Sequence, residues 1–313
     1  LKRGRFYQQY SDYIDNAMAK AAAEYKKVYE LDPEKLTGLG EGYYIQVMLQ
    51  EMVAQGQKEE ALAVIEEVEP HASQRLQDYF NSVRNKLFDS PEERIAFLEE
   101  RVDKNPEDQA LIKELRDLYK EQGMNDKVQE LNEKLYALDP NYENTMALAD
   151  FAVNNANYDS AIKYLNEALN KTDDAEEKAR INLKISDAYQ NKENLQEARN
   201  FARQAIQLDS DWGQPYIQIA TIYAQAVQQC ISGRKIERKD KVVYWLVLDY
   251  LDKARSVDSS VSGTVQRLYQ SYEPVTPTTE EKFFSGWETG QEMEVDASLN
   301  QCYSWINETT KVR

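Results

Sequence analysis

Residues 181–210, INLKISDAYQNKENLQEARNFARQAIQLDS, contain two helix-forming runs separated by a short polar turn. In each run, small and apolar residues recur at helical spacing on one face: Ile185, Ser186 and Tyr189 in the first, and Ala198, Ala202 and Ala205 in the second. Small residues allow two helix backbones to approach closely, and a tyrosine can fill the space above them. The segment therefore predicts two antiparallel helices in contact.

The same kind of helix ending recurs along the chain at a regular interval. The signals stand at Pro33, Pro70, Pro106, Pro140, Ser210 and Ser259. The four prolines follow one another at steps in the mid-thirties, and the step from Pro140 to Ser210 is twice as long, which makes two units. A proline just past a helix end cannot continue the hydrogen-bonded ladder. Such a period predicts a stack of helical hairpins.

This pattern resembles the tetratricopeptide repeat over roughly residues 40–260. The resemblance implies an all-α, superhelical array of helical hairpins, although Arg116 stands where the family prefers glycine or alanine. We expect residues 1–39 to form an N-terminal helical cap or a degenerate repeat, and residues 40–272 to form the repeats. Residues 273–313 are expected to form an extended tail that packs back on the array.

The last repeat carries an insertion near residues 228–242. The spacing from Tyr223 to Ala254 is about twice the spacing from Tyr189 to Ala205, the equivalent residues of the preceding repeat. The inserted stretch contains a basic set: Arg234, Lys235, Arg238 and Lys239. It predicts either a solvated loop or longer hairpin whose charges pair with acidic neighbours, or a docking loop for an acidic partner.

The charge balance restricts the kind of partner. Lys and Arg total 38 and Asp and Glu total 55, which gives a net charge of −17. This balance argues against nucleic acid or an anionic membrane surface as the principal partner. No run of about eighteen apolar residues occurs, so we expect no direct membrane insertion. Because the chain starts with Leu1 and Lys2, we expect that a targeting segment has been removed.

The sequence offers no catalytic constellation. His71 is the only histidine and follows Pro70 in an inter-repeat turn, so a Ser-His-Asp, Cys-His or His-rich metal site cannot be assembled. A glycine-rich phosphate loop is also missing from the sequence. We therefore predict no catalytic residues, no metal and no cofactor. Cys230 and Cys302 lie far apart in the sequence, a spacing that fits either two buried thiols or one long-range disulfide.

A binding groove is the better-supported prediction. When the first helix of each repeat is projected onto the concave side of the array, Asp117, Asp150 and Asp187 fall at equivalent places. One turn earlier the same face carries a mostly apolar row: Lys113, Met146, Leu183 and Ile217. These rows suit an extended peptide with basic and hydrophobic side chains, and the alternative is that the aspartates are ordinary solvent-facing residues. The Asn and Lys clamp of chaperone-binding tetratricopeptide domains is not present at these places.

The last third of the chain has a narrower resemblance. A Tyr-Trp helix, the run FFSGWETG and the ending CYSWINETTKVR resemble the C-terminal part of exported tetratricopeptide proteins of Bacteroidota, over roughly residues 212–313. The resemblance implies an envelope location and a scaffold role. This chain departs from the pattern by inserting DASLNQ before Cys302.

The ending itself alternates in a way that suits a short strand or an extended strap. An open helical array leaves the apolar face of its last hairpin uncovered. We expect the tail to cover that face with Trp287, Tyr303, Trp305 and Ile306, held in an oxidising compartment by a Cys230–Cys302 disulfide.

Two classes of function remain. The leading hypothesis is a non-enzymatic protein–protein interaction scaffold of the bacterial cell envelope, periplasmic or associated with the envelope through partners, which binds a peptide or protein segment in its concave groove. The alternative is a carbohydrate- or nutrient-binding accessory protein, suggested by Trp212, Trp287 and Trp305.

Overall fold

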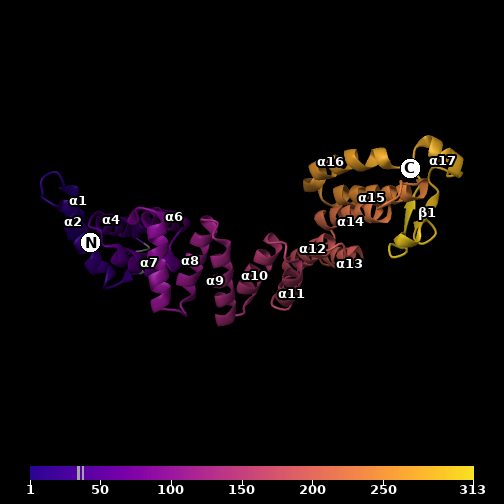
Figure 1. Cartoon of the computed structure of the whole chain (residues 1–313). Helices are drawn as coiled ribbons and strands as arrows, with labels where there is room; N and C mark the ends of the chain where they lie inside the picture. The colour runs from indigo at the N-terminus through magenta and orange to yellow at the C-terminus, as the bar shows by residue number, and fades with distance from the viewer. Residues whose placement is uncertain (34–35, 37–38) are drawn as a thin grey trace. The chain divides into compact units, whose positions relative to one another are not determined.

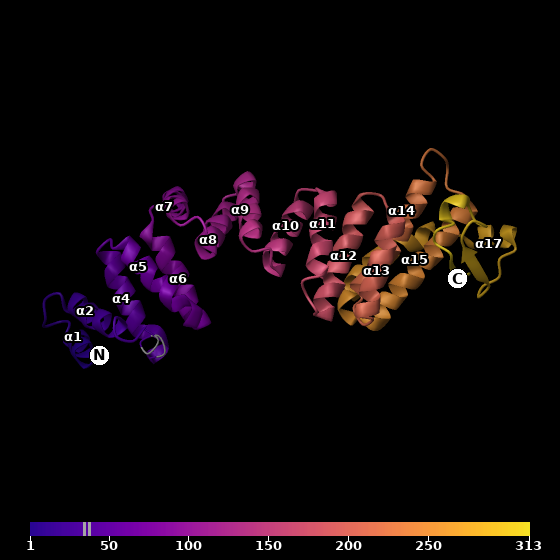
Figure 2. The same ribbon diagram turned by 90° about the horizontal axis from the view of Figure 1, so that it is seen from below.

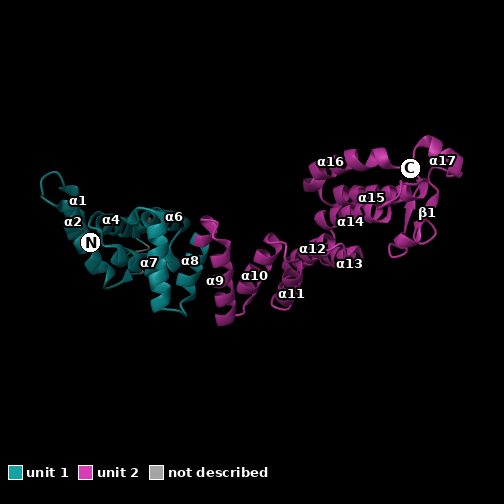
Figure 3. Cartoon of the chain, viewed as in Figure 1, with its two compact units in different colours: residues 1–118 teal, residues 119–313 magenta. Residues whose placement is uncertain are grey.

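The computed structural model describes residues 1–33, 36 and 39–313. The chain divides into two compact units, Leu1–Leu118 and Tyr119–Arg313, which are treated separately below (Figure 3). In both units nearly all regular structure is α-helix, and one short two-stranded sheet lies near the C-terminus (Figure 1). The all-α prediction with a short β element at the C-terminal end is confirmed.

The first unit is helical, and α2, α4, α5 and α6 enclose one apolar core. Its helices are α1 (Lys2–Gln9), α2 (Ala17–Tyr29), α4 (Tyr43–Ala54), α5 (Lys58–Val68), α6 (Gln74–Leu87), α7 (Pro91–Lys104) and most of α8 (Gln109–Glu121), with 3-10 turns η1 (Leu39–Gly42) and η2 (Glu69–His71). Tyr25, Ile45, Ile65 and Phe80 are fully buried in this core.

The N-terminal residues form a hairpin of α1 and α2 and not one long capping helix. Gly4 permits the close contact, because a Cβ atom at this position would lie 2.4 Å from Cε1 of Tyr25. Within the predicted segment 1–39, residues 34–35 and 37–38 lie outside the described part of the chain. The described part fits a degenerate first repeat better than a single cap helix.

The second unit contains the clearest hairpins. Its helices are α9 (Asn125–Leu138), α10 (Tyr142–Asn154), α11 (Tyr158–Leu169), α12 (Ala175–Asn191), α13 (Leu195–Leu208), α14 (Gln214–Cys230), α15 (Arg238–Val257), α16 (Ser262–Tyr272) and α17 (Thr279–Ser285). Each consecutive pair from α10 to α15 packs together, and Figure 2 shows these helices side by side within the unit. The predicted contact residues Ile185, Ser186, Ala198, Ala202 and Ala205 are all fully buried.

The turns after the first helices α8, α10 and α12 share one backbone geometry. Gly123, Ala156 and Glu193 adopt left-handed φ values of 70°, 54° and 61°. The next residue then donates its N–H to a carbonyl five positions back: Met124 to Tyr119 at 2.9 Å, Asn157 to Ala152 at 2.8 Å, and Asn194 to Tyr189 at 3.0 Å. This pattern is a Schellman-type helix ending. It establishes Tyr119, Ala152 and Tyr189 as equivalent positions of successive repeats.

The insertion lengthens the last hairpin and does not form a large projecting loop. Helix α14 continues seven residues past Tyr223, whereas α12 continues only two past Tyr189. Helix α15 begins sixteen residues before Ala254, whereas α13 begins ten before Ala205. The connection between α14 and α15 is therefore only residues 231–237. The extra helical turns provide surface on which the tail packs.

The tail folds back on α14 and α15. Strands β1 (Glu292–Val295) and β2 (Glu308–Lys311) pair antiparallel, with Glu292 opposite Lys311, and the 3-10 turn η5 (Gln301–Tyr303) lies between them in sequence. Four tail side chains are buried with α14 and α15 in one cluster: Val295, Tyr303, Ile306 and Val312. The other connecting 3-10 turns are η3 (Ser259–Val261) and η4 (Glu273–Val275).

The shared turn makes a direct stability prediction. Ala156→Gly should raise the free energy of unfolding by about 0.5–1 kcal/mol, because glycine adopts left-handed φ without steric cost. Gly123→Ala is the matched opposite change, since no atom lies within 4 Å of a Cβ at Gly123 and only its φ opposes the substitution. Urea unfolding of both variants measures the effect. Equal stability of Gly123→Ala and the parent would contradict it.

Candidate functional site

The tail is anchored by a polar cluster around Glu308. Its carboxylate accepts hydrogen bonds from the Tyr223 and Tyr250 hydroxyls, the latter at 2.7 Å, and pairs with Arg203. Burial raises the pKa of both tyrosines, so both phenols stay protonated and donate. Arg199 Nη1 donates to the Ile306 carbonyl at 2.6 Å. The β2 end of the tail is therefore bound by α13, α14 and α15.

A second group holds the last residue of the chain. Arg313 Nη2 lies 2.6 Å from Asp249 and 2.8 Å from Asp252, and its Nη1 lies 2.6 Å from the Tyr269 hydroxyl. The Thr310 hydroxyl also donates to Asp249 at 2.5 Å. Hydrogen bonds of this charge-assisted kind are stronger than neutral ones. They bind the strand to both α15 and α16.

The basic residues of the insertion mostly contact the protein itself. Arg234 makes a bidentate pair with Asp240 at 2.6 and 2.7 Å, and the Tyr303 hydroxyl donates to the same carboxylate at 2.7 Å. Burial alone would raise the pKa of Asp240, but the hydrogen bonds from Arg234 and its other neighbours hold it below its usual value. Lys239 Nζ lies 3.3 Å from the Ser298 carbonyl.

The docking loop for an acidic partner therefore stays a prediction, although several of its basic side chains also contact the tail. The Arg238 guanidinium lies 5.7 Å from the centre of the Phe284 ring, and Lys241 pairs with Glu281 at 2.7 Å. Lys235, Arg238 and Lys239 are all exposed, and Lys235 is the one of these three for which no contact with the tail is found among the described residues. The alternative of a longer hairpin paired with acidic neighbours agrees with these contacts.

The two cysteines are joined in the structure. Cys230, at the end of α14, and Cys302, in η5, form a disulfide with Cα atoms 5.9 Å apart, a usual separation for such bonds. Arg234 Nη2 lies 3.3 Å from the Cys230 sulfur. The bond thus attaches the tail beside the Arg234–Asp240–Tyr303 cluster.

The three tryptophans suggested as sugar-binding residues are half-buried against the protein's own side chains. Trp287 packs edge-on to Trp245 with ring centres 5.8 Å apart. Trp305 lies 5.9 Å from Tyr223, and Trp212 packs against the cluster that contains Leu183. The indoles are engaged in packing, which gives no specific support to the carbohydrate hypothesis.

The predicted acidic row has three different environments. Asp117 lies in the first unit and pairs with its neighbour Arg116 at 2.8 Å. Asp150 on α10 pairs with Lys184 of α12 at 2.6 Å. Asp187 on α12 has no basic partner among the described residues, and its side chain is exposed. Only Asp187 keeps a carboxylate that is not neutralised by a neighbouring cation.

The predicted apolar row does not line an open surface at two of its positions. Leu183 and Ile217 are 9% and 4% exposed and belong to the packed interior between neighbouring helices. Met146 is half-buried against α12, and Lys113 in the first unit is also half-buried. Helical projection predicted that Leu183 and Ile217 lie on the concave face. In the structure Trp212 packs against Leu183, and Ile217 is buried among the side chains of the neighbouring helices.

Beside Asp187, an amide network connects α12 with α14. Gln190 accepts from Gln218 at 2.8 Å and donates to Gln225 at 2.9 Å. Although the Asp187 side chain is exposed, crowding by neighbouring atoms removes part of the hydration of its carboxyl and raises its pKa to about 6. A hydrogen bond with Gln218 acts in the opposite direction. We name these four residues the aspartate–glutamine face.

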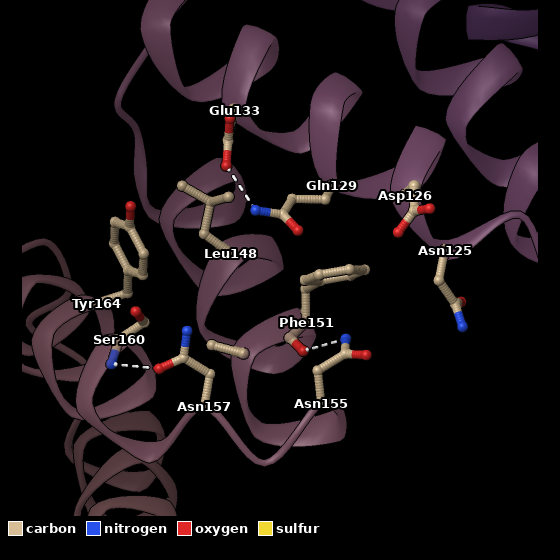
Figure 4. A pocket seen from close by; sticks show the side chains of 11 residues that line it. Asn125, Asp126, Gln129, Glu133, Leu148, Phe151, Asn155, Asn157, Ser160 and Tyr164 are labelled. Atoms are coloured by element: carbon tan, nitrogen blue, oxygen red, sulfur yellow. Dashed lines mark hydrogen bonds between the residues drawn. The ribbon is translucent and has the colours of Figure 1, made fainter.

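A separate hollow lies on the other side of α10. It has a volume of about 220 Å³ and is bordered by α9, α10 and α11 (Figure 4). Its lining combines two carboxylates with amides and apolar side chains: Asn125, Asp126, Gln129, Glu133, Leu148, Phe151, Ala152, Asn155, Asn157, Ser160 and Tyr164. A smaller hollow of about 150 Å³ lies in the first unit between α2 and α4.

Sequence reasoning missed the larger hollow, although one signal for it was present. Ala152 stands at the position that Tyr119 and Tyr189 occupy in the neighbouring repeats, as the common turn geometry shows. A methyl group in place of a phenol leaves space unless neighbouring side chains fill it. The tyrosine-to-alanine difference was visible in the sequence, but the absence of a compensating side chain was not.

The described residues provide no group of His, Cys, Asp and Glu side chains that could hold a metal ion. His71 lies exposed in η2. Among the helices of the described chain, none is long and apolar enough to cross a bilayer.

Residues 179–211 match the family model of the tetratricopeptide repeat. The matched segment covers α13, the turn before it and most of α12, which pack as an antiparallel hairpin. This segment of the chain matches a tetratricopeptide repeat, and the preceding hairpin of α10 and α11 uses the same turn.

Several solved structures are similar to the chain at low identity. MamA 41-end from Desulfovibrio magneticus RS-1 is 15% identical, with a TM-score of 0.43, and the match covers 59% of this chain and 96% of that one. YrrB, described as a TPR protein with an unusual peptide-binding site, is 13% identical over 80% of this chain and 99% of that one, with a TM-score of 0.43. The TPR2AB-domain:pHSP90-complex of yeast Sti1 is 17% identical over 88% and 97%, with a TM-score of 0.35. The curated proteins include no match.

The disulfide leads to a redox prediction. Reduction should lower the free energy of unfolding by up to about 4 kcal/mol, because the bond closes a long loop in the unfolded chain. Urea unfolding with and without reductant measures the difference, and the double variant Cys230→Ala, Cys302→Ala should not respond to reductant. Free alkylation of both thiols in unreduced protein would contradict the prediction.

Proposed function

We propose that the protein is a non-enzymatic scaffold that binds a segment of another protein on the aspartate–glutamine face of α12 and α14. The observation that carries this proposal is Asp187, an exposed carboxylate without a basic partner in the described residues, beside three hydrogen-bonded glutamines. The tetratricopeptide repeat at residues 179–211 contains Asp187 and Gln190.

The chemistry of this face suits an extended peptide with a basic side chain. Gln218 is buried, whereas Gln190 and Gln225 are half-buried; a glutamine amide both donates and accepts, so these two can pair with peptide N–H and C=O groups. A carboxylate in a partly dehydrated place gains more from a Lys or Arg than a fully hydrated one does. The net charge of −17 also favours the approach of basic segments. This refines the predicted groove, because Asp117 and Asp150 are already paired with cations.

We place the protein in the bacterial cell envelope as part of the same proposal. Disulfides persist in oxidising compartments, and the tail of this chain is attached by one. The resemblance of residues 212–313 to exported tetratricopeptide proteins of Bacteroidota agrees with that location. Fractionation of cells with an epitope on the full chain tests it.

A variant series separates the three aspartates. In cross-linked pull-downs from envelope fractions, Asp187→Lys should reduce recovery of a specific partner at least tenfold, because it reverses the charge on the face. Asp150→Asn should have a much smaller effect, since Lys184 already neutralises that carboxylate. Asp173→Lys is the control for a charge change at an exposed position outside the face. Identical recovery with Asp187→Lys and the control would exclude this face as the site.

The raised pKa of Asp187 predicts a pH effect on stability. Its value is about 6 in the folded protein and 3.8 for an unperturbed aspartate, so the folded state holds the proton more tightly. The contribution of this group to stability is therefore complete below pH 3.8 and is lost as the pH rises to about 6. Relative to the parent, Asp187→Asn should gain stability between pH 4.5 and pH 7. Urea unfolding at both pH values tests this, and parallel behaviour of the two proteins would refute it.

A further inference from the structure

The C-terminal tail lies in a groove between α13, α14 and α15, which we call the tail seat. The hollow between α9, α10 and α11 lies at the equivalent position two hairpins earlier along the array. Fully buried residues relate the helices to one another: Leu135, Ala168, Ala205 and Ala254 in the second helices α9, α11, α13 and α15, and Ala149, Ser186 and Ala220 in the first helices α10, α12 and α14. Positions counted from these residues can be compared directly between grooves.

The tail seat lies between α13, α14 and α15, and four of its residues bind Ile306 and Glu308 of the tail. Arg199 and Arg203 stand six and two residues before Ala205, Tyr223 stands three after Ala220, and Tyr250 stands four before Ala254. Arg203, Tyr223 and Tyr250 bind the Glu308 carboxylate, and Arg199 binds the Ile306 carbonyl. The Arg199 guanidinium also lies 5.0 Å from the centre of the Trp305 ring.

In the groove between α9, α10 and α11, the residues at the corresponding positions all line the hollow. Gln129 and Glu133 stand six and two before Leu135, Ala152 stands three after Ala149, and Tyr164 stands four before Ala168. Figure 4 shows Gln129, Glu133 and Tyr164 around the space above α10, with Phe151 and Leu148 beside them. Thus the geometry of the tail seat recurs, with Ala152 in place of the Tyr223 phenol and Glu133 in place of the Arg203 cation.

The intermediate groove, between α11, α12 and α13, is filled by side chains. Its residues at the two aromatic positions are Tyr189 and Phe201, whose rings stack with centres 5.5 Å apart and planes 17° apart. The hollow beside Ala152 therefore results from a side-chain difference and is not a feature of every repeat.

We infer that the α9–α11 groove binds an extended segment of a partner protein in the way that the α13–α15 groove binds the tail, with the charge reversed. The segment carries a Lys or Arg at the place of Glu308 and a large apolar or aromatic side chain that fills the space above Ala152. This second site lies on the opposite side of α10 from Asp150 and is independent of the aspartate–glutamine face.

The charges of the groove support this occupant. Gln129 Nε2 donates to Glu133 at 2.8 Å, and no basic side chain in the described part of the chain pairs with Glu133. Asp126 adds a second carboxylate to the lining. The tail of a second copy of this chain is a poor occupant, because its Glu308 would meet Glu133 and Asp126. Gln129 occupies the position equivalent to Arg199, which donates to the tail backbone. Its amide can donate to the backbone of the bound segment in the same way.

The chain's own tail supplies the probe. Two fluorescein-labelled peptides of residues 303–312, one natural and one with Glu308→Lys, are titrated with the oxidised full chain at about 0.15 M salt, where long-range attraction is screened. Fluorescence anisotropy should show the Glu308→Lys peptide binding at least tenfold more tightly than the natural peptide. The tail seat does not compete, since the covalently attached tail occupies it.

Three variants test the site. Ala152→Tyr introduces the residue that equivalent positions carry and should weaken binding of the Glu308→Lys peptide at least tenfold by filling the hollow. The double variant Gln129→Arg, Glu133→Arg copies the tail seat and should make the natural peptide the preferred one. Glu130→Arg, an exposed residue of α9 outside the lining, is the control and should retain the parent preference.

The outcomes are decisive in both directions. Reversed preference in the double variant supports the site even if Ala152→Tyr lowers the melting temperature. Equal binding of both peptides to the parent, tighter binding of the natural peptide, or unchanged preference in the double variant would overturn the inference. Asp187→Lys should not alter these titrations, so failure here and failure of the proposed face are distinguishable.

Discussion

A stack of helical hairpins buries apolar surface only between neighbours, and this constraint governs the second unit. Helices α14 and α15 form the last long hairpin of the unit; α16 packs on α15, but the remaining apolar residues of the hairpin would face solvent without a further cover. The tail meets this need by burying Val295, Tyr303, Ile306 and Val312 against them. The longer α14 and α15, the basic residues near Arg234 and the disulfide all contribute to the attachment of that cover.

The same position of the repeat has three different uses along the unit. Tyr189 stacks on Phe201 and fills its groove, while Tyr223 donates to Glu308 and so binds the tail. Ala152 leaves a hollow that a side chain of another molecule can enter. A repeat architecture permits this variation, because each groove is formed by neighbouring helices and can change without disturbing distant ones.

The two binding proposals differ in their physical basis. The aspartate–glutamine face depends on a carboxylate whose pKa is raised by lost hydration and on amides that can pair with a peptide backbone. The α9–α11 groove depends on shape and on charge opposite to that of the tail seat. Both favour basic segments, in keeping with the net charge of −17, and together they would allow one chain to hold two segments.

Local sequence determined the helical hairpins, because period, small residues and helix endings act over a few turns. The buried contacts of Ile185, Ala198 and Ala205 follow from this local pattern. The pairing of Asp150 with Lys184 required the neighbouring repeat, and so did the burial of Leu183. Helical projection of a single repeat cannot show which face the next repeat covers.

The sequence alone also determined that the final residues suit a strand-like cover and that two cysteines were available to attach it. The tertiary structure decided which side chains contact this C-terminal tail. Arg234 turned out to bind Asp240 beside Tyr303, although the tail that brings Tyr303 there is distant in sequence. Likewise, the hollow at Ala152 exists because the neighbouring rings of Phe151 and Tyr164 border the space without filling it, which depends on the packing of three helices.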